Sequence, residues 1–210
     1  MFVLTNQLVF PSVDKANEQG VLAIGGDLSL ERLKRAYKSG IFPWYSDEEP
    51  ILWYSPNPRM VLFPNELKIS KSMEQILKSG RFKITYNKEF EEVLMNCKTI
   101  NRTKQGQDGT WITSEMQKAY IRLYEDGMAK SVEVWDGQEL VGGLYGVEVG
   151  NVFCGESMFS KISNASKIAL IALVNNSTKE YQLIDCQVYN DHLASLGAKE
   201  IHRNEFLKYL

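Results

Sequence analysis

Three polar side chains lie inside two short apolar segments in the second half of the chain. Glu156 belongs to NVFCGESMFS at residues 151–160, and Asp185 and Gln187 belong to LIDCQV at residues 183–188. Carboxylates that meet at one site can take up protons, and an amide beside them can orient a polar substrate. Because an unpaired ionised carboxylate is costly to bury, we expect Glu156 to meet a cation or to lie at an opening that a cation can enter. A structural ion pair or a position at a rim would explain Glu156 equally well.

The two segments have the pattern of buried strands joined by one helix. This helix is predicted to begin at residues 164–166 and to carry apolar side chains through residue 173. Its length suits a right-handed crossover between parallel neighbouring strands. Since side chains alternate along a strand, Asp185 and Gln187 share one face. If the strands are neighbours, these two residues and Glu156 converge on a cleft at the strand ends, where ligands commonly bind.

Regular elements are predicted from residue 60 onward. Besides the two segments above, we expect strands at residues 60–63, 82–86, 129–135, 139–147 and 198–202. We expect helices at residues 70–79, 88–97, 114–126 and 191–196 and from residue 204. This order predicts an α+β fold with a mixed sheet. It matches the order of elements in the N-acetyltransferase superfold, which is an analogy of topology and not of function.

The first sixty residues are rich in turns and aromatic side chains. After a Gly-Gly-Asp turn at residues 25–27, Ser29 is placed to cap a helix that Gly40 ends. The prolines that follow exclude a long helix and favour extended segments. We therefore predict a small N-terminal α/β domain at residues 1–60, packed on an acetyltransferase-like catalytic domain at residues 61–210.

Composition excludes several classes of protein. The chain has 210 residues, 44% of them hydrophobic, and a formal net charge of -2, which suits a globular protein with a full core. Its longest apolar run, residues 168–174, is too short to cross a bilayer, and its N-terminus lacks the basic start of a signal peptide. We expect no membrane contact and a cytoplasmic location. The cysteines form no CxxC pair and the histidines lack zinc-ligand spacing, which predicts free thiols and no metal.

Several short runs along nearly the whole chain carry a family resemblance. They are GGDLS (25–29), GIFPWY (40–45), ILWYSPNPR (51–59), GTWIT (109–113), SVEVW (131–135), LVGGLYGV (140–147), FCGESMFS (153–160), NASK (164–167), LIDCQV (183–188) and HLASLGA (192–198). In this order they closely resemble leucyl/phenylalanyl-tRNA-protein transferases. The resemblance implies an enzyme that moves Leu or Phe, and Met as well, from an aminoacyl-tRNA to the N-terminal Lys or Arg of an acceptor protein, marking it for N-end-rule degradation. It also implies the acetyltransferase-like fold of the C-terminal domain.

The same resemblance implies a role for particular side chains. It assigns catalysis to Asp185, Gln187 and Glu156. It assigns the 3′ adenosine of the tRNA to four aromatic residues, Trp44, Trp111, Tyr120 and Tyr37. It assigns the donor side chain to an apolar pocket formed by Leu144, Phe153, Leu173 and Ile184.

Such a transfer needs no cofactor, because an aminoacyl ester is already activated. The attacking amine needs positioning, loss of a proton and stabilisation of the tetrahedral oxyanion. An α-amino group with a pKa near ~8 can give its proton to a carboxylate. We expect Asp185 to hold and polarise the amine, Gln187 to orient it, and Glu156 to balance the acceptor's positive charge or to order the site. These three roles can be exchanged among the residues.

Two other functional classes stay open from the residues alone. An acyl-CoA N-acetyltransferase shares the fold, but its pyrophosphate loop is rich in glycine and residues 160–167 contain none. A non-catalytic RNA-binding module would explain the aromatic side chains and the basic segment at residues 66–104. It would leave Glu156, Asp185 and Gln187 without a role.

Overall fold

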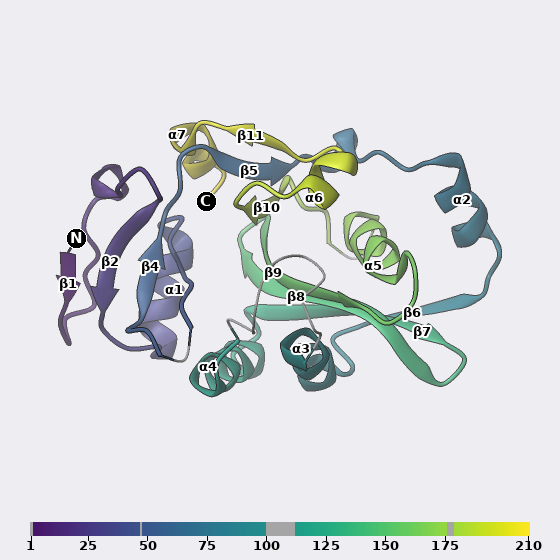
Figure 1. The fold of residues 1–210 in the computed structure, drawn as a ribbon, viewed down its shortest axis with the longest axis horizontal. Helices are drawn as coiled ribbons and strands as arrows, with labels where there is room; N and C mark the ends of the chain where they lie inside the picture. Colours follow the sequence, from purple (N-terminus) through teal and green to yellow (C-terminus); the bar gives the residue numbers. More distant parts are fainter. Residues whose placement is uncertain (1, 47, 100–111, 176–178) are drawn as a thin grey trace.

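Two sheets of unequal size organise residues 2–46, 48–99, 112–175 and 179–210, the part of the chain that this computed structural model describes (Figure 1). The smaller sheet contains β1 (Phe2–Leu4), β2 (Val21–Gly25), β3 (Phe42–Pro43) and β4 (Leu52–Tyr54). Its strand order is β1-β2-β4-β3, with β1 and β2 parallel and the other neighbours antiparallel. Strands this short give little stability by themselves, so the small sheet depends on packing against the rest of the chain.

Helix α1 (Leu30–Lys38) lies between β2 and β3 and confirms the predicted helix. Ser29 occupies the N-cap position but makes no side-chain capping bond. Instead, Oδ1 of Asp27 accepts a hydrogen bond from the backbone N–H of Ser29 at 2.8 Å, so a carboxylate two residues earlier stabilises this turn. The buried face of α1 carries Leu33, Ala36 and Tyr37.

The larger sheet is mixed. Its strands are β5 (Arg59–Leu62), β6 (Phe82–Tyr86), β7 (Ala129–Asp136), β8 (Glu139–Val149), β9 (Val152–Ser160), β10 (Leu183–Gln187) and β11 (Lys199–Ile201). Their spatial order is β11-β5-β10-β9-β8-β7-β6. β9 and β10 pair in parallel, and the other neighbours pair antiparallel. The predicted α+β class and the predicted parallel pairing of the Glu156 and Asp185 segments are therefore confirmed.

Helices cover both faces of the larger sheet (Figure 1). α3 (Phe90–Thr99) and α4 (Ser114–Glu125) lie on one face, and α5 (Ala165–Val174), the crossover between β9 and β10, lies on the other. Thr113 caps α4 as predicted, since its hydroxyl oxygen accepts a hydrogen bond from the N–H of Met116 at 3.1 Å. The remaining helices are α2 (Lys71–Lys78), α6 (Asp191–Ser195) and α7 (Arg203–Phe206).

Glycines in β8 allow its neighbours to approach closely. A Cβ atom on Gly142 would lie 2.5 Å from the Cβ of Ala165 in α5. A Cβ atom on Gly146 would lie 2.3 Å from the carbonyl oxygen of Cys154 in β9. Both separations are well inside van der Waals contact, so a larger residue at either position would push α5 or β9 away from β8.

One hydrophobic core joins the two sheets. Its buried members come from both parts of the chain and include Leu22, Tyr37, Trp53, Val93, Leu123 and Val147. The chain leaves the small sheet at Tyr54 and enters the large sheet at Arg59, so the predicted division at residue 60 falls inside β5. The two domains at residues 1–60 and 61–210 stay a prediction.

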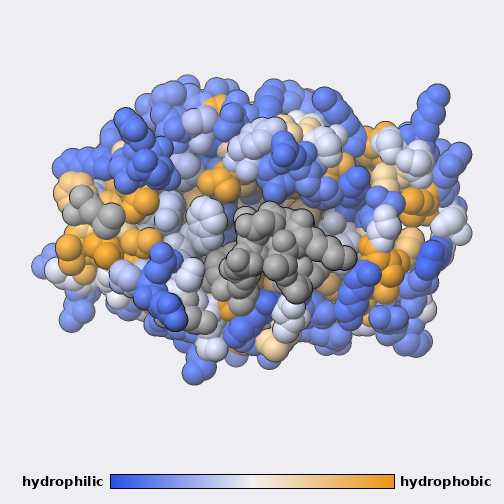
Figure 2. All heavy atoms as spheres, viewed as in Figure 1, coloured by the Kyte–Doolittle hydropathy of each residue, from blue (hydrophilic) through white to orange (hydrophobic). Residues whose placement is uncertain are grey.

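The surface seen in Figure 2 is mainly hydrophilic. Apolar side chains gather at the left of that view, over the small sheet, and again at its right. Val3 in β1 and Val9 are 76% and 66% exposed. Within the described ranges, every helix is too short or too polar to cross a membrane.

Candidate active site

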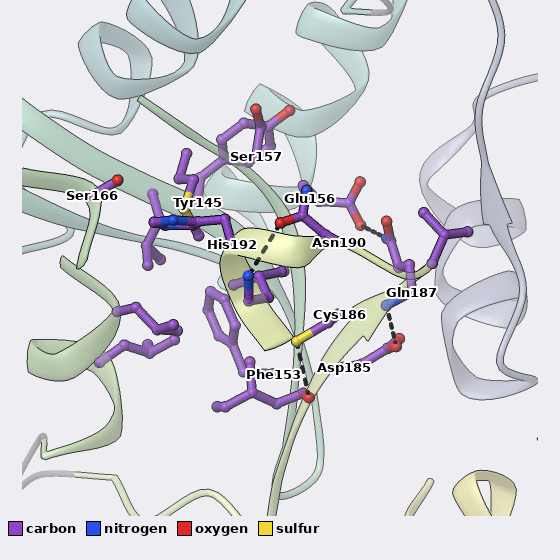
Figure 3. Close-up of a pocket in the computed structure, with 18 of the residues that line it drawn as sticks. Tyr145, Phe153, Glu156, Ser157, Ser166, Asp185, Cys186, Gln187, Asn190 and His192 are labelled. Carbon is purple, nitrogen blue, oxygen red and sulfur yellow. Dashed lines mark hydrogen bonds between the residues drawn. The ribbon is translucent and has the colours of Figure 1, made fainter. Parts of the chain in front are cut away.

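A cavity of about 470 Å³ lies among β8, β9, β10, α5 and the segment that contains Trp44 (Figure 3). This volume is in the range of sites for small molecules. Apolar side chains from four different elements line it, namely Leu144, Phe153, Leu173 and Ile184. The structure therefore brings together all four residues that we expected to form the donor pocket. Polar residues line another part of the same cavity, among them Glu156, Ser157 and Gln187.

Glu156 stands in β9 at the wall of this cavity and is 9% exposed. Its carboxyl oxygens lie 2.8 Å from the Tyr37 hydroxyl and 2.6 Å from the Tyr120 hydroxyl, and Oε1 accepts a hydrogen bond from Nε2 of Gln187 at 3.0 Å. Its direct partners are thus uncharged, and no described cation pairs with it. Burial raises the pKa of Glu156 to about 7, although the hydrogen bonds from Tyr120 and Tyr37 oppose this shift.

Asp185 faces a different partner. It is fully buried, and its two oxygens accept hydrogen bonds from Nε and Nη2 of Arg59 at 2.7 and 2.6 Å. The Arg59 guanidinium carbon lies 4.8 Å from the ring centre of Phe42 and 4.6 Å from that of Phe206. Burial alone would lower the pKa of Arg59, but the charge of Asp185 and its hydrogen bonds raise that pKa above its ordinary value. This geometry is a bidentate, charge-assisted pair held between two aromatic rings.

Gln187 links the two carboxyl groups. Its backbone N–H donates to Oδ1 of Asp185 at 2.9 Å, and its side chain donates to Glu156 (Figure 3). The register of β10 against β5 shifts between Asp185 and Gln187, and Gln187 has a φ of 64°, in the left-handed region that favours glycine. Backbone strain of this kind costs about 1 to 3 kcal/mol and is concentrated at functional sites. The bulge directs the Gln187 amide into the cavity beside Glu156.

The aromatic residues assigned to the adenosine occupy unlike positions. Trp44 lines the cavity and packs against Tyr54, with ring centres 5.5 Å apart. Tyr37 and Tyr120 are buried behind Glu156, so only their hydroxyl groups point toward it. Trp111 lies outside the described residues.

Arg59 is a site residue that the sequence analysis missed. The available signal was an arginine at the start of the apolar run RMVLF (residues 59–63). A cation in a buried strand requires an anion nearby, just as a buried carboxylate requires a partner. His192 also lines the cavity, although the sequence analysis assigned it no role in the site. Burial together with the charge of Lys167 lowers its pKa, which keeps the ring neutral.

The cysteines are free thiols, as predicted, and Cys186 contributes to the cavity wall. Burial raises the pKa of Cys186 and of Cys154 well above the usual range, so neither is activated as a nucleophile. Among the described residues, no group of three or more His, Cys, Asp and Glu side chains is arranged to hold a metal ion.

Known protein families match most of the chain. A family model described as Leucyl/phenylalanyl-tRNA protein transferase matches residues 61–210, and a model of its N-terminal domain matches residues 26–57. This chain belongs to the leucyl/phenylalanyl-tRNA protein transferase family. The resemblance carried by the short sequence runs is therefore confirmed, and the chain is a transferase.

Relatives in the leucyl/phenylalanyl-tRNA protein transferase family match over the full length. The protein of that name from Flavobacterium johnsoniae is 62% identical, covering 100% of this chain and 99% of the relative. The one from Christiangramia forsetii is 55% identical, covering 100% of both chains. The one from Pectobacterium carotovorum is 53% identical, covering 100% of this chain and 89% of the relative.

Two solved structures resemble this family member distantly. A conserved protein of unknown function from Bacteroides thetaiotaomicron covers 72% of this chain and 53% of its own, with a TM-score of 0.47 and 13% identity. A GCN5-related N-acetyltransferase from Kribbella flavida covers 78% of this chain and 58% of its own, with a TM-score of 0.34 and 9% identity. At these scores the description of the fold rests on its own strand order.

Proposed function

We propose that this transferase moves Leu, Phe or Met from the 3′ end of an aminoacyl-tRNA to the N-terminal Lys or Arg of an acceptor protein. The product carries a new N-terminal residue that marks it for N-end-rule degradation, and the reaction takes place in the cytoplasm. The observation that carries the proposal is the cavity itself. In a chain whose residues 26–57 and 61–210 match the family, apolar side chains line part of the cavity, and Glu156 and Gln187 line it as well.

The apolar part of the cavity receives the donor side chain. Leu144, Phe153, Leu173 and Ile184 offer it only hydrocarbon and aromatic surface. Side chains unbranched at Cβ enter such a pocket more readily than Ile and Val, which widen at the first carbon. Shape discrimination of this kind is worth about 1 to 3 kcal/mol for each methylene-sized change. Transfer of Ile and Val is therefore slower than that of Leu but is not abolished.

The aromatic residues hold the 3′ adenosine. Trp44 is available for stacking because it forms part of the cavity wall, and we assign Trp111 to the same task. Tyr37 and Tyr120 act through their hydroxyl groups, since their rings are buried. Base stacking contributes about 1 to 3 kcal/mol for each base.

The reaction exchanges an ester for an amide. The acceptor's α-amino nitrogen attacks the ester carbonyl carbon, the bond from that carbon to the ribose oxygen breaks, and the amine loses the proton that the ribose oxygen gains. Gln187 orients the amine, and Glu156 faces the acceptor's positive side chain. Asp185 is held by Arg59 and fixes the Gln187 backbone, so we assign it to positioning and not to proton transfer.

Transfer to defined peptides tests this function. Leucyl-tRNA and a peptide beginning with Arg should give a peptide extended by Leu, whereas a peptide beginning with Ala should not be extended. Isoleucyl- and valyl-tRNA should transfer more slowly than leucyl-tRNA. Acetylation of the Arg peptide from acetyl-CoA would instead assign the site to an acetyltransferase, and tRNA binding without transfer would assign it to RNA binding.

A further inference from the structure

Four oxygen atoms from three residues form a closed ring beside the cavity. The hydroxyl oxygens of Tyr37 and Tyr120 are 2.7 Å apart. The Tyr37 oxygen is 2.8 Å from Oε1 of Glu156, and the Tyr120 oxygen is 2.6 Å from Oε2. Each of these separations is that of an O–H···O hydrogen bond. The ring therefore contains three hydrogen bonds that join α1, α4 and β9.

The number of hydrogen atoms fixes the protonation state of this ring. Three hydrogen bonds need three hydrogens, and the two phenols supply only two. If Glu156 were ionised, each tyrosine would donate to a carboxylate oxygen, and the two phenol oxygens would face each other at 2.7 Å with no hydrogen between them. A protonated Glu156 supplies the third hydrogen and satisfies every contact.

The hydrogen bond from Gln187 identifies the oxygen that carries this proton. Nε2 of Gln187 donates to Oε1 of Glu156, so Oε1 is the carbonyl oxygen of the acid. In the protonated state, Oε2 bears the hydrogen and donates it to the Tyr120 oxygen 2.6 Å away, whereas an ionised Glu156 accepts from Tyr120 instead. Tyr120 donates to Tyr37, and Tyr37 donates to Oε1. All donors and acceptors of the ring have one consistent direction.

Neighbouring charges leave this neutral state in place. The titratable groups around Glu156, taken from every element packed against it, are Tyr37 in α1, Tyr120 in α4, Tyr145 in β8, Cys154 in β9, Asp185 in β10 and Arg59 in β5. Asp185 and Arg59 act on Glu156 in opposite directions, and they are bound to each other. Burial raises the pKa values of both ring tyrosines, so their protons stay on at neutral pH.

We infer that Glu156 is an uncharged carboxylic acid in the free enzyme at mildly acidic pH, closed into this ring by Tyr37 and Tyr120. We also infer that it releases its proton when a cationic acceptor residue enters the cavity. The second half rests on the proposed function. The free enzyme thereby avoids a buried anion without a counter-charge, which would be costly. An acceptor without a positive side chain cannot compensate the ionised form, so the ring makes Glu156 a specificity-determining residue, and Tyr37 and Tyr120 are positioning residues for it.

A carboxyl titration of the free protein tests the first half. In protein labelled with ¹³C at the Glu side-chain carboxyl, one resonance should titrate near pH 7, and it should be absent from Glu156→Gln. Tyr120→Phe should move its midpoint upward, because the ionised carboxylate loses a stronger hydrogen bond than the neutral acid does. Tyr124→Phe is the matched control: this hydroxyl, in the same helix, donates to the carbonyl of Asn87 and should leave the midpoint unchanged.

The outcome that overturns the inference is visible in the wild type alone. If every Glu resonance titrates in the ordinary range near ~4.5, Glu156 is ionised at neutral pH and the ring is not closed by a proton. This result does not depend on whether any variant folds.

Calorimetry with an acceptor peptide tests the second half. A peptide beginning with Arg is titrated into the enzyme at about pH 6 in two buffers of different ionisation enthalpy, which reports the protons released on binding. The wild type should release close to one proton more than Glu156→Gln, and the peptide's own amino group contributes equally to both. Equal release from the two proteins overturns the coupling.

The two ideas fail separately. If the enzyme transfers Leu while Glu156 titrates in the ordinary range, the protonated ring is excluded and the proposed function stands. A resonance that titrates near pH 7 in a protein that transfers nothing keeps the ring and removes the function.

Discussion

At the scale of single residues, the ion pair of Arg59 and Asp185 is predicted to matter for stability because both side chains are buried. Arg59→Met leaves a buried anion without its partner, and such a loss costs about 3 to 5 kcal/mol of unfolding free energy, which urea denaturation measures. Arg81→Met is the matched control, because Arg81 is 59% exposed in its pair with Asp136 and exposed pairs contribute about 0 to 1 kcal/mol. Equal losses in the two variants would contradict a role for burial.

Trp44 gives a prediction about substrate binding. If its ring stacks on the terminal adenine, Trp44→Ala should raise the KM for leucyl-tRNA about 5- to 150-fold, which corresponds to the loss of one stacked base. The KM for an Arg peptide should change little. Trp135→Ala removes an indole whose N–H donates to Thr85 in β6, and it serves as the control. Unchanged tRNA kinetics in a folded Trp44→Ala enzyme would remove Trp44 from the adenosine site.

Glu156 predicts an unusual dependence of stability on pH. Its pKa in the folded protein is about 7, above the ordinary 4.5, so the native state binds the proton more tightly than the unfolded chain does. The contribution of Glu156 to the free energy of unfolding is therefore complete below about pH 4.5. It is lost as the pH rises through about 7, by up to about 3 kcal/mol. Thermal denaturation between about pH 5 and about pH 8 should show a larger fall in Tm for the wild type than for Glu156→Gln. Parallel curves would contradict this origin.

At the scale of elements, the bulge at the end of β10 predicts that stability and activity separate. Gln187 has a φ of 64°, a conformation that glycine adopts without strain. Gln187→Gly should keep or raise the unfolding free energy while single-turnover transfer to an Arg peptide falls about 100-fold, because the amine loses its orienting amide. Asn164→Gly relieves comparable strain at a φ of 70° outside the cavity and should leave transfer unchanged. A Gln187→Gly enzyme with wild-type turnover would exclude Gln187 from the reaction.

The sequence predicted the crossover from β9 to β10 because periodicity reports which face of an element is buried. It could not reveal the bulge, since one residue in the left-handed region leaves no periodic trace and Gln187 is not a glycine. Nor could it match partners: Glu156 and Asp185 are both buried acids, and only the three-dimensional arrangement gives the arginine to one and two phenols to the other. In the small sheet, the sequence predicted extended segments where β3 and β4 lie but no strand at β1 or β2. β1 spans only three residues, too few to show alternation.

At the scale of the whole molecule, residues distant in sequence hold the site together. Phe206 in α7 and Phe42 in β3 both pack against the Arg59 guanidinium. Phe206→Ala should cost about 3 to 5 kcal/mol in urea denaturation, the usual loss for a buried phenylalanine. It should also slow transfer, because Arg59 then holds Asp185 and Gln187 less firmly. Phe82→Ala is the control, since Phe82 packs against Arg81 and does not line the cavity. An equal loss of transfer in that variant would contradict the link.

The hydrophobic core shared by the two sheets limits how this protein can be recombined. Tyr37 comes from the first sixty residues, yet its hydroxyl group contacts Tyr120 in α4 and Glu156 in the larger sheet. A chimera that exchanges this segment between relatives therefore replaces part of the cavity wall and part of the core at once. Such a chimera is expected to be active where α1 and α4 come from the same relative, because Tyr37 and Tyr120 lie in hydrogen-bond contact. The small sheet is therefore a component of the site and not an independent module.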